Sequence, residues 1–300
     1  MVFIRKIGVI FLRRWWDIRL LLLKRSSKSW HKVVGKYEMV IDPNDYVDRA
    51  YFLGNHDPGL RYAIKKWVRV GETCIDIGAQ KGYFTLLFAQ IVGKNGRVLA
   101  FEPDPRSRQA LAINCKRNKL CNVEILEYGL GERDYFCQFH LSSQLGWSSQ
   151  FPNREADKTI VSTIEVPIRS FDHLVSSSKI VLDITQVSFI KIDCEGSEPF
   201  VLAGMTQVLS KTKPFIWIEV NMDSLRVAGS NPNIFQDRLK ELGYSIFLPR
   251  YYYDRFGRPS LSLKLLNDGL PSNFLYDLVA LKVEENLSRL KSANIEVICN

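Results

Sequence analysis

Short apolar runs alternate with longer helical stretches from residue 73 onward. This alternation is typical of a parallel sheet covered by helices on both faces. The runs predict strands at 73–78, 96–103, 123–130, 187–193, 214–221, 244–248 and 276–283. The stretches between them predict helices at 82–92, 104–118, 198–211 and 234–242.

The alternation breaks once, after residue 130. Residues 134–141 and 159–168 are predicted as two antiparallel strands joined by the Ser-rich loop 142–158, and residues 249–274 as a long aromatic and basic loop. We therefore predict an α/β fold with a seven-stranded, mostly parallel, doubly wound sheet and a β-hairpin insertion. One domain, residues 46–300, is expected to hold this fold.

Residues 1–45 follow a different pattern and are predicted to be a basic amphipathic helix followed by a linker. Its apolar stripe is Ile4, Ile7, Phe11, Trp15, Ile18 and Leu22. Two interpretations stay open: residues 1–25 lie on a membrane surface, or the helix docks on its own domain or a second subunit. A membrane-spanning segment is not expected, because arginines interrupt every apolar run.

The net positive charge of the chain is concentrated in this N-terminal segment. The whole sequence carries 41 Lys and Arg against 32 Asp and Glu, a net charge of +9. Residues 1–36 contain ten of the basic residues and one acid, Asp17, which leaves 31 of each sign in the remainder. The body is therefore neutral overall, and no nucleic-acid partner is expected.

Six cysteines occur without a C-x-x-C pair, and the four histidines have no spacing typical of a metal site. We interpret the cysteines as small buried residues in a reducing compartment. The expected location is cytoplasmic, with peripheral contact at the inner face of a membrane as the further possibility that the N-terminal helix raises.

Acidic residues stand at the carboxyl ends of the predicted strands, where ligands bind in open α/β sheets. The strand ends carry Asp76 with Gly78, Glu102, Gly129, Asp193 with Glu195, and Glu219. The first turn lacks the G-x-G-x-x-G pattern that holds a diphosphate, and its acid suits a cationic ligand. Glu102 can accept hydrogen bonds from ribose hydroxyls. These positions predict an adenosyl cofactor without phosphates.

Four segments stand out by their order and spacing: IDIGAQKGYFTLLFAQIVGKNGRVLAFEPDPRSRQALAINCKRN, TIEVPIRSFDHL, FIKIDCEGSEPFVLAGM and KPFIWIEVN. Together they resemble the FkbM-type S-adenosylmethionine-dependent methyltransferases, and the K-I-D-x-E-G-x-E block is the most specific part. The resemblance implies a Rossmann-like class I methyltransferase sheet with S-adenosylmethionine as cofactor. It also implies the cofactor-binding residues Asp76, Gly78, Ala79, Gln80, Gly82, Glu102 and Pro103. Family members commonly have Asn in place of Gln80 and an apolar residue in place of Lys81.

The acidic block after the fourth parallel strand contains the expected catalytic residues. We predict that Asp193 is a general base or a metal ligand and that Glu195 helps to bind the acceptor. Glu198 matches the same block but is equally well explained as a first-turn helix acid. Two loops are expected either to shape the acceptor pocket or to cover the sheet: 142–158, with Trp147, and 249–274, with Tyr251, Tyr252, Tyr253, Arg255 and Arg258.

The function predicted from these features is O-methylation of a hydroxyl on a sugar, a glycan or glycolipid, or a secondary metabolite. The partner is then a small-molecule or glycan acceptor. Two alternatives remain: an NAD-dependent oxidoreductase or epimerase, and a catalytically inactive methyltransferase-like binding module at a membrane surface.

Overall fold

The structure is a computed structural model that describes residues 30–34, 36–42, 45–53, 56–152, 157–266 and 275–298. The expected amphipathic helix lies outside these residues. Among the described helices, none combines the length and the apolar character needed to cross a bilayer. The cysteines in the described part, Cys74, Cys115, Cys121, Cys137 and Cys194, are all unpaired thiols.

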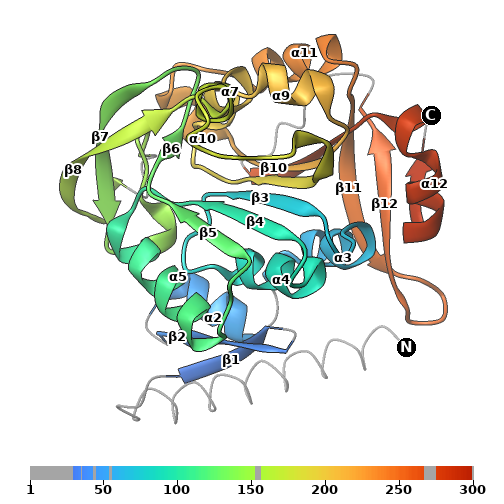
Figure 1. The fold of residues 1–300 in the computed structure, drawn as a ribbon, viewed down its shortest axis with the longest axis horizontal. Coiled ribbons are helices and arrows are strands. Elements are labelled where there is room, and N and C mark those ends of the chain that lie inside the picture. The colour runs from blue at the N-terminus through green and yellow to red at the C-terminus, as the bar shows by residue number, and fades with distance from the viewer. Residues whose placement is uncertain are drawn as a thin grey trace, which may run out of the picture.

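A sheet of nine strands forms the centre of the described structure (Figure 1). Its order is β14-β12-β11-β13-β10-β9-β3-β4-β5, and the five strands from β10 to β5 run parallel. The bounds are β3 Thr73–Ile77, β4 Arg97–Phe101, β5 Val123–Leu126, β9 Val187–Ile192, β10 Phe215–Asn221, β11 Ser245–Tyr253, β12 Pro259–Leu265, β13 Leu275–Leu281 and β14 Ile295–Ile298. The predicted mostly parallel α/β sheet is confirmed.

Two more strands than predicted join one edge of this sheet. Strand β11 continues through Tyr253 and pairs antiparallel with β12, so much of the expected loop 249–274 is a hairpin. Leu261 and Leu263 of β12 are buried in the core, which explains why this aromatic segment forms a strand. Strand β14 pairs parallel with β12 and lies at the edge.

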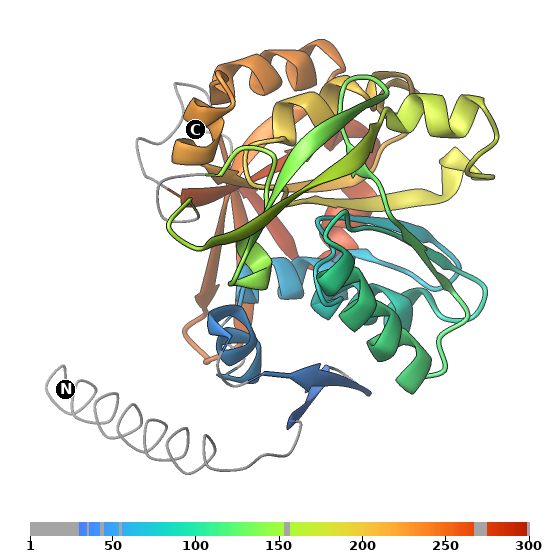
Figure 2. The same ribbon diagram turned by 90° about the vertical axis from the view of Figure 1, so that its left-hand side faces the viewer.

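A second, three-stranded sheet contains the predicted hairpin insertion. Strand β7, Tyr135–Ser142, pairs antiparallel with β8, Ile160–Arg169. The predicted strand 123–130 is divided: its first part is β5, and Gly129–Leu130 forms β6, which pairs with β8. The hairpin therefore begins at the carboxyl end of the main sheet, and Figure 2 shows it across one side of the body.

Helices cover both faces of the main sheet (Figures 1 and 2). One face is packed by α3 Pro58–Trp67, α4 Tyr83–Val92, α5 Pro105–Arg117 and α12 Val283–Ala293. The other is packed by α7 Phe171–Ser176, α8 Glu198–Ala203, α9 Thr206–Lys211, α10 Met222–Val227 and α11 Pro232–Glu241. The predicted helix 198–211 is two helices with Gly204 between them, and a Cβ at Gly204 would lie 2.0 Å from the Gly131 carbonyl oxygen.

The segment expected to be a linker is folded against the body. Strands β1 Trp30–Val34 and β2 Tyr37–Ile41 form a hairpin, and α2 Tyr46–Leu53 follows it. Met39 and Ile41 are buried in the core cluster that contains α4. The Asn114 Oδ1 atom of α5 accepts a hydrogen bond from the Val40 backbone N–H at 2.9 Å. The expectation of a linker before residue 46 is therefore corrected.

Candidate active site

The parallel strands reverse their order between β3 and β9, so their carboxyl ends open a cleft at this point. The cleft has a volume of about 590 Å³, including space open to solvent. Its lining residues come from the carboxyl ends of β3, β4 and β9 and from the hairpin insertion. They are Ile77, Gly78, Gln80, Phe101, Glu102, Pro103, Tyr128, Gly129, Leu130, Phe139, Leu145, Gly146, Ser148, Gln150, Ile168, Asp193, Cys194, Glu195 and Ser197.

The turn after β3, residues 78–82, forms one wall of the cleft. Gly78 has φ 74°, and a Cβ at this position would lie 1.8 Å from the Asp193 carbonyl oxygen. Only glycine fits so close to the neighbouring strand end. The Gly78 and Ala79 amides both donate to the Phe101 carbonyl oxygen at 3.0 Å. The turn is therefore packed tightly between the ends of β9 and β4.

Glu102 follows β4 and faces this turn. Its Oε2 atom accepts a hydrogen bond from the Gln80 backbone N–H at 2.7 Å, and its Oε1 atom accepts one from the Asp104 N–H at 2.8 Å. Burial raises the pKa of Glu102 to about 7, against these two hydrogen bonds, which lower it. Each carboxylate oxygen keeps a further lone pair for a ligand hydroxyl.

The predicted cofactor residues divide into two groups. Gly78, Gln80, Glu102 and Pro103 line the cleft, whereas Asp76, Ala79 and Gly82 do not. Ala79 is buried, and Gly82 begins α4. Asp76 is fully buried, and its Oδ2 atom accepts a hydrogen bond from the Thr85 hydroxyl at 2.6 Å. Asp76 therefore lies beneath the turn, and its role in cofactor binding stays a prediction.

Lys191 is a buried cation that sequence reasoning did not single out. It lies opposite Asp76 in the register of β3 and β9. Its ammonium nitrogen is 3.1 Å from Asp193 Oδ2 and 3.6 Å from Asp76 Oδ1, and it donates to the Gly78 carbonyl oxygen at 3.1 Å. Burial lowers the pKa of Lys191, but the charges of Asp193 and Asp76 outweigh it, and the pKa is raised.

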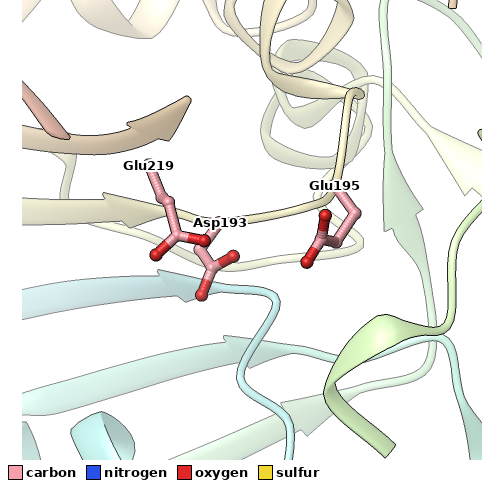
Figure 3. Close-up of side chains that lie close together, drawn as sticks. All are labelled: Asp193, Glu195 and Glu219. Carbon is pink, nitrogen blue, oxygen red and sulfur yellow. The ribbon is translucent and has the colours of Figure 1, made fainter. Parts of the chain in front are cut away.

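Asp193, Glu195 and Glu219 turn their carboxylates toward one another at the end of β9 and β10 (Figure 3). One oxygen of each lies within 4.8 Å of the other two, a spacing at which all three can contact one small cation. The charge of Asp193, followed by burial, raises the pKa of Glu219 well above its usual range. The predicted pair Asp193 and Glu195 is thus brought together, with Glu219 as a third member.

Glu195 and Glu198, the other acids of this block, have different hydrogen-bond partners. Asn221 and Ser224 donate to Glu195 Oε2 at 3.1 and 3.3 Å, and burial followed by the charge of Asp193 raises the pKa of Glu195 to about 8. Glu198 does not line the cleft: its Oε1 atom accepts hydrogen bonds from the backbone N–H groups of Cys194 and Gly196 at 3.1 and 3.2 Å. Glu198 therefore holds the loop that carries Glu195.

A smaller acidic cavity adjoins Asp193 on the side of α3 and β13; the space between its atoms totals about 180 Å³ but is too narrow to hold a water molecule. Its carboxylates are Asp57, Asp193, Glu219 and Asp277, and Trp217 and Lys191 also line it. Asp277 stands opposite Glu219 in the antiparallel register of β10 and β13, and burial raises its pKa to about 7. Asp193 and Glu219 could be predicted as strand-end acids, whereas Asp57 and Asp277 could not, because they come from elements distant in sequence.

The two candidate acceptor loops lie in different places. Leu145, Gly146, Ser148 and Gln150 of the first loop line the cleft, and the Ser149 hydroxyl donates to the Glu195 carbonyl oxygen at 2.9 Å. In the described part of 249–274 no residue lines the cleft. There, Tyr251 lies against Tyr62 of α3, with ring centroids 6.1 Å apart. The first loop thus forms part of the site, and the second extends the sheet.

Comparison with known families places this cleft in context. Residues 76–246, more than half of the chain, match the model of the methyltransferase FkbM domain. The chain belongs to the FkbM methyltransferase family. S-adenosylmethionine is the methyl donor of this family, and the matched region contains every residue that lines the cleft. No curated protein matches the chain.

Solved structures show distant similarity. An FkbM methyltransferase from Methylobacillus flagellatus is 18% identical with a TM-score of 0.42, over 79% of this chain and 55% of that one. A putative rRNA methylase from Clostridium thermocellum is 12% identical with a TM-score of 0.41, over 76% and 96%. An S-adenosylmethionine-dependent O-methyltransferase from Thermotoga maritima is 13% identical with a TM-score of 0.41, over 85% of both.

The lining of the cleft fits S-adenosylmethionine. Glu102, Asp193 and Glu195 are its charged side chains, and no Lys or Arg is among the described residues that line it. Carboxylates suit a sulfonium and an ammonium group, whereas a diphosphate would be repelled. Glu102 has lone pairs that can accept hydrogen bonds from hydroxyl groups, and Phe101, Leu130, Phe139 and Ile168 are apolar residues of the lining. This electrostatic character disfavours the alternative of a nicotinamide cofactor.

We predict that Lys191→Met lowers the free energy of unfolding by about 3 kcal/mol or more, because Asp76 and Asp193 would lose their buried cation. Chemical denaturation monitored by circular dichroism measures this loss. Arg226→Ala, which removes an exposed ion pair with Asp223, is the matched control and should change nothing measurable. Equal stability of the Lys191 variant and the wild type would refute the central position given to this lysine.

Proposed function

We propose that this protein transfers the methyl group of S-adenosylmethionine to a hydroxyl of a sugar, a glycan or glycolipid, or a secondary metabolite. The observation that carries the proposal is the position of Asp193. This residue lines both the cofactor cleft and the acidic cavity beside it. A hydroxyl bound beside Asp193 in the cleft would therefore meet a carboxylate next to the methyl donor.

Bound S-adenosylmethionine supplies an electrophilic methyl group on a sulfonium. The protein must then align the acceptor oxygen with that group and remove the hydroxyl proton. Asp193 is the proposed base, and Lys191, which lies 3.1 Å from its Oδ2 atom, orients the carboxylate. Glu195 is the proposed acceptor-binding residue, held by Asn221 and Ser224. If a divalent cation binds Asp193, Glu195 and Glu219, Asp193 is a ligand instead of the base.

The proposed function predicts where a labelled methyl group will appear. Purified protein and tritiated S-adenosylmethionine, incubated with cell extract, should label the glycan, glycolipid or small-molecule pool. The label should resist mild alkali, which hydrolyses methyl esters but not methyl ethers. Label confined to protein or nucleic acid would contradict the proposed acceptor class. Binding of S-adenosylhomocysteine without transfer to any pool would instead support an inactive binding module.

Asp193→Asn is expected to lower turnover about 100-fold or more, because an amide cannot accept the hydroxyl proton. The dissociation constant for S-adenosylhomocysteine, measured by isothermal titration calorimetry, should stay close to that of the wild type. Asp183→Asn, at an exposed 3-10 helix N-cap, serves as the control for an Asp replacement outside the cleft. Full turnover of the Asp193 variant would show that this carboxylate is not the base.

We also propose that residues 1–25 contact an anionic membrane surface, at the inner face of the membrane. The apolar stripe and the local charge of +9 within residues 1–36 support this contact. Since β1 begins at Trp30 and its hairpin packs on the body, a truncation should end before residue 30.

Deletion of residues 1–29 should abolish sedimentation with vesicles that contain anionic lipid, because the amphipathic segment supplies the positive charge. Binding of S-adenosylhomocysteine should remain, since the hairpin and α2 are kept. Vesicles of neutral lipid are the control and should bind the full chain more weakly. Sedimentation of the truncated protein with anionic vesicles would assign the membrane contact to another surface.

A further inference from the structure

The turn that leads from β3 into α4 is held on its outer side by α2. This helix lies before residue 76, where the family match begins. Gln80, Lys81 and Tyr83 each contact a side chain of α2. Because Gln80 is a non-glycine residue with a left-handed backbone angle, the conformation of the turn needs support from outside.

The first contact is a buried ion pair. Lys81 Nζ lies 2.6 Å from Asp48 Oδ2 and 3.9 Å from Asp45 Oδ2. The exposed fractions of the three side chains are 9% for Lys81, 1% for Asp48 and 7% for Asp45. Charges so far from water are costly unless they are paired, so the loss of one partner strongly disfavours the arrangement that buries the other.

The second contact involves Tyr51. Its hydroxyl donates to Gln80 Oε1 at 3.1 Å, and its ring stacks on Tyr83 with centroids 4.5 Å apart and an interplanar angle of 4°. Gln80 has φ 49°, which an L-residue adopts at a cost of about 1 kcal/mol. The backbone N–H of this same residue donates to Glu102 at 2.7 Å. Tyr51 therefore supports a residue that itself holds the proposed ribose ligand.

The backbone of Lys81 is fixed from the other side. Its carbonyl oxygen accepts a hydrogen bond from Asn114 Nδ2 at 2.8 Å, and the Asn114 Oδ1 atom accepts one from the Val40 N–H of β2 at 2.9 Å. The Asp42 N–H donates in turn to Asp48 Oδ2 at 2.7 Å. Hairpin, helix and turn thus form one connected network around Lys81.

We propose that Asp48, Tyr51 and Lys81 form a turn clamp, through which the N-terminal elements hold the turn in the conformation that binds S-adenosylmethionine. The three are positioning residues, since none lines the cleft. This inference rests on the proposed cofactor site. It assigns a role in that site to Lys81, which does not itself line the cleft.

The test compares cofactor affinity with stability. Asp48→Asn and Lys81→Met should each lower the unfolding midpoint and raise the dissociation constant for S-adenosylhomocysteine about tenfold. The double variant Asp48→Asn/Lys81→Met has no unpaired lysine and should regain stability. Its dissociation constant should stay raised, because the charged contact between helix and turn is absent. If affinity returned together with stability, the ion pair would be shown to contribute to stability alone and not to cofactor binding.

Two further variants keep the test decisive if the charge variants fold poorly. Tyr51→Phe removes only the hydroxyl that reaches Gln80 and should raise the dissociation constant about threefold at unchanged fold. Glu72→Gln breaks the ion pair with Arg289 away from the cleft and should lower stability while affinity is kept. Wild-type affinity of the Tyr51 variant, or an equal loss in the Glu72 variant, would overturn the clamp.

One control separates this inference from the cofactor site itself. Glu102→Gln should weaken binding of S-adenosylhomocysteine, because the amide offers one oxygen acceptor where the carboxylate offers two. If the wild type binds and the Glu102 variant binds weakly while the clamp variants bind normally, only the clamp is refuted. If the wild type does not bind, the proposed function fails first.

Discussion

A lysine ammonium cannot stay charged inside a protein unless anionic or dipolar groups replace the lost water. Lys191 meets this requirement at the junction of β3 and β9, where Asp76, Asp193 and the Gly78 carbonyl oxygen surround it. Asp76 belongs to the strand under the cofactor turn, Gly78 to the turn itself and Asp193 to the acidic block. The buried charge of Lys191 thus fixes the positions of the turn after β3 and of the acidic block relative to each other.

Two further acids of the cleft, Glu102 and Glu195, have raised pKa values. Burial raises the pKa of Glu102 to about 7, and burial with the charge of Asp193 raises the pKa of Glu195 to about 8. A positive group that binds beside these carboxyls would lower their pKa values and favour their charged forms. A sulfonium donor supplies such a group. The acidic residues at the strand ends therefore favour binding of the cationic donor that the family uses.

Much of the fold could be predicted because its signals are local. The parallel strands are apolar runs, and the acids at their ends stand directly after them, so Glu102, Asp193 and Glu195 could be placed at one edge. Asp57, Asp277 and Trp217 could not, because they reach the site through strand register and through the start of α3. The surroundings of Asp76 could not be predicted either, because every residue of β3 is buried and only the fold brings Thr85 and Lys191 to this carboxylate.

The N-terminal elements show the same limit at a larger scale. Asp42 and Asp45 lie in the segment expected to be a linker, and nothing in the sequence around Lys81 indicates a buried partner. Lys81 nevertheless forms a buried pair, since it reaches Asp48 and Asp45 across the space between α4 and α2. Neither partner is informative by itself, and the pairing depends on the hairpin packing on α5. The conformation of the cofactor turn in this chain is thus decided partly by residues outside the family match.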